Sequence, residues 1–155
     1  MTQQDENDGE RGRERAKEGH DDRSGRGALG RVTAHVLALE ASDRAWDDAL
    51  IMRREPLLAR VAEQLMKSAS AVGPHIADGY GRRSPRDRIR FYEYALAENG
   101  EAETWYRNGR HVLPPGVIDE RISRLTSIRR LLLTMIKRER ESGRWNDGPG
   151  SPNRR

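Results

Sequence analysis

The sequence predicts an all-α protein: an antiparallel up-and-down four-helix bundle with a disordered tail at each end. Three observations predict this fold. Apolar residues recur at spacings of three and four in four separate segments, as they do on the buried face of a helix. Glycines and prolines separate these segments at short connections, which place successive helices antiparallel. No segment alternates apolar and polar residues in the manner of a strand.

Both ends of the chain have compositions that disfavour folding. Residues 1–30 contain one large aliphatic residue after the initiator methionine, Leu29, among eight acids and six bases. Residues 143–155 combine three glycines and two prolines with a single tryptophan. Neither end can bury enough apolar surface to offset its loss of conformational entropy. We therefore expect residues 1–30 and 143–155 to be disordered and residues 31–142 to form the bundle.

The first two helices are predicted from their apolar patterns. The first begins near Thr33 and extends toward Met52, with charged residues on its other face. Pro56 suits the first turn of the second helix, where its missing N–H has no intrahelical partner. The second helix then carries a regular apolar stripe formed by Leu58, Val61, Leu65, Ala69, Val72 and Ile76.

Proline and glycine also predict where the second helix bends and ends. Pro74 lies inside the apolar pattern and crowds the carbonyl of Ser70, so we expect a kink there. Gly79 and Gly81 are expected to end the helix, because glycine takes the left-handed cap conformation without steric cost.

The third helix has clear start and stop signals. Ser84 can cap it, with Pro85 in the first helical position and Asp87 completing a capping box. Asn108 and Gly109 are expected to stop it. A short loop then leads to the fourth helix, expected over residues 117–141, whose apolar stripe consists of Ile118, Ile122, Leu125, Ile128, Leu132, Met135 and Ile136.

Composition excludes several classes of protein. The chain has 29 basic and 25 acidic residues, and its net charge of +4 permits a polyanionic partner without requiring one. It has no cysteine, which excludes disulfide and thiolate chemistry. It also lacks the apolar segment of a secretory signal and any apolar run long enough to cross a bilayer. We therefore expect a cytoplasmic protein with no membrane partner.

The segment that joins the second and third helices carries a family motif. Its residues are Gln64, Lys67, Ala71, Val72, His75, Ile76, Ala77, Asp78, Gly79, Gly81, Arg82, Arg83, Ser84, Arg90 and Phe91, followed by Glu101 and Glu103. This order resembles the four-helix-bundle proteins encoded by intervening sequences of bacterial 23S rRNA genes. In that family the second helix ends in Ser-(Ile/Val)-x-x-Asn-Ile-Ala-Glu-Gly, and a Gly-Arg-x-Ser turn follows. This chain departs from the pattern at Ala71, His75 and Asp78, which replace Ser, Asn and Glu.

The resemblance implies a homo-oligomer, commonly a five-membered ring, with no established enzymatic activity and no cofactor. The family is similar in fold to the accessory variability determinant of diversity-generating retroelements, a basic barrel that binds nucleic acid and a reverse transcriptase. The resemblance therefore raises three partners as expectations: further copies of the chain, RNA or DNA, and a reverse transcriptase.

The densest cationic cluster of the chain lies within this motif, where five arginines between positions 82 and 90 are opposed only by Asp87. Cations at a helix start are unfavourable unless an anion or nearby carboxylates compensate them, and arginine suits phosphate. We therefore predict a contact with nucleic acid, structured RNA in particular, through Arg82, Arg83, Arg86 and Arg90. The alternative is a solvated face paired with Asp78, Glu93 or the acids of another subunit.

Other charged residues receive structural interpretations. A second basic region on the fourth helix is interpreted as an exposed helix face; it consists of Arg121, Arg124, Arg129, Arg130, Lys137, Arg138 and Arg140. His75 and Asp78, together with Glu101 and Glu103, are interpreted as a polar network between helices rather than a metal site, because Glu101 and Glu103 point in different directions. No residue set matches a catalytic site, so the chain is predicted not to be an enzyme.

Two further expectations concern partners. The wide apolar stripe of the fourth helix and the aromatic third helix exceed what one thin bundle buries, so the chain is expected to form homo-oligomers. The alternative function is a protein-interaction scaffold or an accessory subunit, for example of a reverse transcriptase.

Overall fold

The computed structural model describes residues 31–146, and of residues 144–146 it describes the backbone alone. The disorder predicted for residues 1–30 and 147–155 concerns residues outside this range, whereas residues 143–146, which were also predicted to be disordered, are helical. Within it, no helix is long and apolar enough to cross a membrane.

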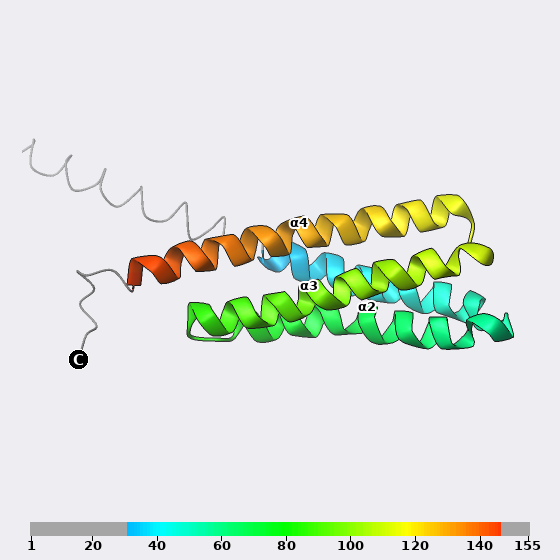
Figure 1. Ribbon diagram of the computed structural model, residues 1–155, viewed down its shortest axis with the longest axis horizontal. Coiled ribbons are helices and arrows are strands. Elements are labelled where there is room, and N and C mark those ends of the chain that lie inside the picture. The colour runs from blue at the N-terminus through cyan, green and yellow to red at the C-terminus, as the bar shows by residue number, and fades with distance from the viewer. Residues whose placement is uncertain (1–30, 147–155) are drawn as a thin grey trace, which may run out of the picture.

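Residues 31–146 form four long helices, which confirms the predicted bundle (Figure 1). The first helix is described over residues 31–52. The others are α2 (Ala59–Tyr80), α3 (Pro85–Asn108) and α4 (Pro115–Asn146). A 3-10 turn, η1 (Pro56–Leu58), precedes α2, and a second one, η2 (Gly109–His111), follows α3. α4 continues past the predicted bundle boundary at residue 142 and extends beyond the turn between α2 and α3 in Figure 1.

The core combines alanines and Met52 of the first helix with mostly larger apolar residues of the other three helices. Alanines at positions 34, 38, 41, 45 and 49 of the first helix are buried. They face Leu65, Val72 and Ile76 of α2, the rings of Tyr92 and Tyr106 of α3, and the predicted stripe of α4. Each large apolar side chain that is fully buried contributes about 1.5–3 kcal/mol to folding.

A buried polar network joins the first helix to α3 and α4. Asp48 is 3% exposed, and its Oδ2 accepts hydrogen bonds from the Tyr106 hydroxyl (2.9 Å) and from Arg121 Nε (2.7 Å). Burial, reinforced by the Asp48 charge, raises the pKa of Tyr106. Because a buried carboxylate is costly without such partners, this network fixes the register of three helices.

The proline and serine start signals of the helices are confirmed, but the capping box predicted for Asp87 is not formed. Pro56 opens η1, one turn before α2, and Pro85 is the first residue of α3. Ser84 Oγ accepts a hydrogen bond from the Asp87 N–H (3.0 Å) and donates one to Asp87 Oδ2 (2.6 Å). The Asp87 carboxylate therefore binds the capping hydroxyl rather than the Ser84 N–H that a capping box would use.

α2 ends at Gly81, as predicted, but the left-handed cap conformation predicted for Gly79 and Gly81 is wrong. Gly81 caps the helix in the right-handed region, with φ −74° and ψ −9°. Gly79 lies inside α2 and is buried, and a Cβ placed on it would come within 2.5 Å of Tyr92 Cε1. Glycine is required at position 79 because α3 approaches there, not because the backbone turns. α2 continues without interruption through the exposed Pro74.

The apolar surplus expected on the third and fourth helices lies mainly on the first. Tyr92 and Tyr106 of α3 are buried, and Leu131 of α4 is half-buried. The exposed large apolar residues of the described chain include six on the first helix: Val32, Val36, Leu39, Trp46, Leu50 and Ile51.

Candidate nucleic-acid interface

The arginine patch, defined as Arg82, Arg83, Arg86 and Arg90, lies at the turn between α2 and α3. Arg82 and Arg83 belong to the turn, and Arg86 and Arg90 lie one helical turn apart on α3. All four side chains are exposed, and none forms an ion pair with a carboxylate of the described residues. The structure thus gathers the four predicted residues at one end of the bundle and leaves their charge in solvent.

Arg88, in the middle of the same cluster, has a different position. Its Nε donates to Glu139 Oε2 of α4 (2.8 Å), where the Glu139 carboxylate is 10% exposed. Its Nη1 donates to the backbone carbonyls of Arg82 (3.0 Å) and Arg83 (2.9 Å). Arg88 therefore ties the turn that carries half of the patch to α4 and holds its backbone in one conformation.

Aromatic rings support two of the patch arginines. The Arg82 guanidinium lies 4.3 Å from the Phe91 ring centre, and Arg90 lies 5.6 Å from the centre of Tyr94. Arg90 Nε also donates to the Tyr94 hydroxyl (2.7 Å), and this hydrogen bond raises the pKa of Arg90. Such cation–π contacts orient a guanidinium without neutralising it.

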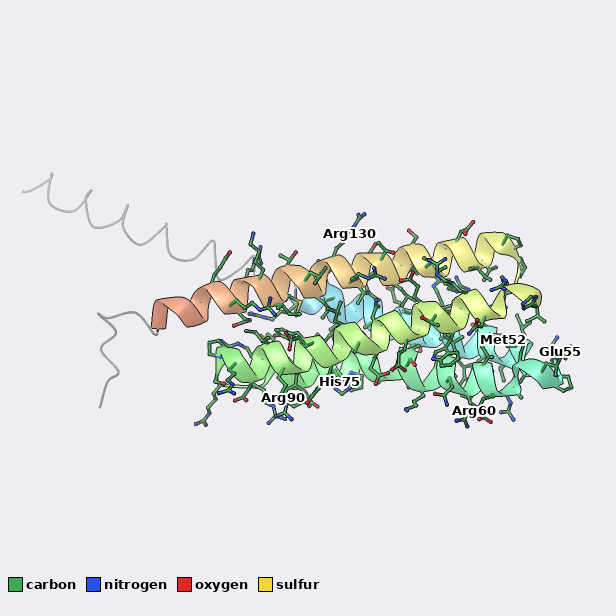
Figure 2. All side chains as sticks on the ribbon, in the orientation of Figure 1. Met52, Glu55, Arg60, His75, Arg90 and Arg130 are labelled. Atoms are coloured by element: carbon green, nitrogen blue, oxygen red, sulfur yellow. The ribbon has the colours of Figure 1, made fainter. Side chains whose placement is uncertain are left out.

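His75 of α2 extends this aromatic surface. Its ring lies 5.6 Å from that of Tyr94, and Figure 2 shows His75 and Arg90 on the same side of the bundle. The Nδ1 atom of His75 is buried and has no hydrogen-bond partner among the described residues. The family's Asn position is thus occupied here by a ring that packs beneath the patch.

The basic region of α4 is largely neutralised within the bundle. Arg121 pairs with Asp48 and Glu120. Arg124 pairs with Glu120 and, at 3.2 Å, with Glu40 of the first helix. Burial would raise the pKa of Glu120, but hydrogen bonds from Arg124 and Arg121 lower it below its ordinary value.

Two more α4 arginines pair with acids of α3. Arg129 pairs with Glu103, and Arg140 pairs with Glu93 at 2.9 Å. Glu93, named above as an alternative partner of the patch, therefore pairs with α4 instead.

The remaining motif residues have structural positions. Val72, Ile76 and Gly79 are buried, whereas Lys67, Ala77, Asp78 and Gly81 are exposed. Ser68 Oγ of α2 donates to the Gln64 carbonyl (2.9 Å) and to Glu101 Oε2 of α3 (3.3 Å), and Glu103 accepts from Arg107 (2.8 Å). The predicted polar contact between these helices is therefore present, through Ser68 rather than His75.

The described residues offer no metal centre. No group of three or more His, Asp or Glu side chains in residues 31–143 could hold a metal ion. Among the described residues Asp78 shares no hydrogen bond with Glu101 or Glu103; Glu101 accepts from Ser68, and Glu103 pairs with Arg107 and Arg129.

Comparison with known proteins agrees with this fold. A family model described as 23S rRNA-intervening sequence protein matches residues 53–133, which include the whole arginine patch. A crystal structure of a protein of unknown function from the S23 ribosomal protein family of Bacteroides thetaiotaomicron superposes with a TM-score of 0.64. The two chains are 21% identical over 70% of this chain and 98% of that one, a likeness that concerns the fold. No curated protein matches the chain significantly.

Proposed function

The chain belongs to the 23S rRNA-intervening sequence protein family, and we propose that it is a non-enzymatic, oligomeric cytoplasmic protein that binds nucleic acid through the arginine patch. Structured RNA is the proposed ligand. One observation carries the proposal: four exposed arginines lie together without a carboxylate partner among residues 31–143, while four arginines of α4 are paired. Arginine binds phosphate oxygens with two parallel hydrogen bonds, so a phosphate backbone suits such a patch.

The fixed turn supports this proposal. Because Arg88 holds the carbonyls of Arg82 and Arg83, the backbone beneath the patch loses little conformational freedom when an anion binds. Tyr94 is 40% exposed beside Arg90, which suits an unpaired base next to the bound phosphates. An RNA hairpin with a single-stranded loop offers both groups.

The test is the affinity of the nuclease-treated full chain for a labelled RNA hairpin, with a DNA duplex of equal length as a second probe. The double variant Arg83→Glu/Arg86→Glu should weaken RNA binding by roughly tenfold or more, since each lost phosphate contact removes counterion release. Stronger binding of the hairpin than of the duplex is expected.

The matched control is Arg53→Glu/Arg54→Glu. Both residues are exposed and lie near η1, at the opposite end of α2, and the change in net charge is the same. This variant should keep nearly all the affinity. Equal losses in the two double variants would mean that net charge alone attracts RNA, and the patch would not be the site.

A protein-interaction scaffold, for example an accessory subunit of a reverse transcriptase, is the second candidate. The exposed apolar residues of the first helix favour it, because contiguous apolar surface marks protein contacts. A protein partner that co-purifies after nuclease treatment, and that Arg83→Glu/Arg86→Glu does not release, would support this candidate over RNA binding.

A further inference from the structure

The first helix is apolar on two opposite faces. Its inner face carries the buried alanines, and its outer face carries Val32, Val36, Leu39, Trp46 and Leu50, each 46% to 58% exposed. The outer residues follow the spacing of a heptad stripe, with Asp43 in the one remaining position. Scattered exposed apolar residues are ordinary, but a regular stripe of half-exposed apolar side chains along one helix indicates a surface that a partner covers.

Charge determines what can cover this outer stripe. Asp43 lies within it and Asp47 beside it, both exposed and without an ion pair among the described residues. Two copies of the stripe packed face to face would bring four carboxylates together, and like charges that face each other across an interface oppose association. The covering surface must therefore be apolar at its centre and cationic at its edges.

The outer face of α4 has this character. Leu133 is 49% exposed, and Arg130 and Lys137 lie three and four residues to either side of it. Neither cation pairs with a described carboxylate, and Figure 2 shows Arg130 pointing away from the bundle. A hollow of about 310 Å³ beside Leu133 is lined by Ile136, Lys137, Arg140 and Glu141. An aromatic side chain seated in a pocket is the usual centre of an interface, and Trp46 can supply it.

We propose that the outer stripe of the first helix in one copy packs on the outer face of α4 in the next copy. The proposal deepens the oligomeric part of the proposed function by naming the two surfaces that meet. Because these surfaces differ, the contact is heterologous and builds a ring or a filament rather than a two-fold dimer. It leaves the arginine patch uncovered, so each added copy presents one more patch to the same RNA.

The first test is the mass of the nuclease-treated full chain by sedimentation at micromolar concentration. The wild type should sediment as a multiple of the 17.7 kDa chain. Trp46→Asp/Leu50→Asp should sediment as a single chain with unchanged helix content, because both side chains are outside the core. Leu57→Asp is the matched control: Leu57 is 87% exposed but belongs to neither surface, and its variant should keep the wild-type mass. A single-chain wild type would overturn the proposal.

The second test exchanges the charges. Asp43→Lys/Asp47→Lys and Arg130→Glu/Lys137→Glu should each sediment as single chains. Mixed in equal amounts they should associate again into species larger than a single chain, because each altered surface then meets its opposite. If Arg130→Glu/Lys137→Glu keeps the wild-type mass, α4 is not the partner surface and the heterologous contact is wrong. RNA affinity is measured separately, so a failure of RNA binding and a failure of assembly are distinguished.

Discussion

Two arginine-rich regions of this bundle have opposite surroundings. On α4, Arg121, Arg124, Arg129 and Arg140 each meet a carboxylate from another helix or from their own. In the arginine patch, the side chains meet aromatic rings or solvent. The same residue type is therefore a structural cross-link in one region and an available cation in the other.

Arg88 and Arg86 show the same contrast within one turn of helix. Arg88 points to the inside of the bundle and binds Glu139, whereas Arg86 is exposed. Density of arginine in the sequence does not separate the two roles. The two roles are separated by the direction in which each side chain leaves the helix and by the position of acids on the facing helix.

The largest effect is expected where the cross-linked arginines are removed. Arg121→Ala leaves the buried Asp48 carboxylate without its cation, and breaking a buried pair in this way costs about 3–5 kcal/mol. Arg86→Ala should change the free energy of unfolding by no more than about 0.5 kcal/mol, as exposed substitutions do. Urea denaturation of the two variants measures both. Similar losses in the two would abolish the distinction between the regions.

A smaller loss is expected from the packing beneath the patch. Gly79→Ala drives a methyl group against the buried Tyr92 ring, and overpacking of this kind costs about 1–3 kcal/mol. Gly100→Ala is the matched control, since a Cβ at that position meets nothing within 4 Å in the middle of α3. It should stabilise the protein by up to about 1 kcal/mol. Thermal unfolding of both variants measures these changes. A Gly79→Ala variant as stable as the wild type would contradict the close packing of Tyr92 on Gly79.

The network around Asp48 should also respond to alkaline pH. The pKa of Tyr106 is raised in the folded protein, whereas in the unfolded chain it has its ordinary value of about 10. At a pH between these two values, the unfolded chain has lost the phenolic proton and the folded protein has kept it. Its stabilising contribution is complete below pH 10 and falls above it, by up to about 1.4 kcal/mol per pH unit. Burial raises the pKa of Tyr92 in the same direction. Urea denaturation from pH 9 to 11 should show a shallower loss in Tyr106→Phe, and an unchanged slope would contradict this assignment.

The fold could be predicted from the sequence because its signals are local. Apolar spacing and the Ser84-Pro85 start signal depend on neighbouring residues alone, and both predict the observed helices. The glycines of α2 were misassigned because the approach of Tyr92 to Gly79 is a contact between helices. The outer stripe of the first helix was not predicted, because its alanines and its larger apolar residues were assigned from the sequence to a single apolar face. In the structure the alanines are buried and the larger residues are exposed.

The candidate site was predictable only in part. The four patch arginines follow from the sequence, but Glu93 pairs with Arg140 rather than with the patch because of a contact across the bundle that the sequence does not show. Arg88 was missed as a positioning residue. Its signal was available, since Arg88 lies one turn before the core residue Tyr92 on the same face of α3. The Asp48 network had no such signal, because its three members are far apart in sequence.

The most direct test of the contrast is the salt dependence of RNA affinity in two neutralised double variants. Arg83→Gln/Arg86→Gln removes two patch cations, and Arg124→Gln/Arg140→Gln removes two paired ones with the same change in net charge. The slope of log affinity against log salt should fall by roughly 1.4 to 2 in the first variant and stay unchanged in the second. An equal fall in both, or a fall in the second alone, would contradict the assignment of RNA binding to the arginine patch.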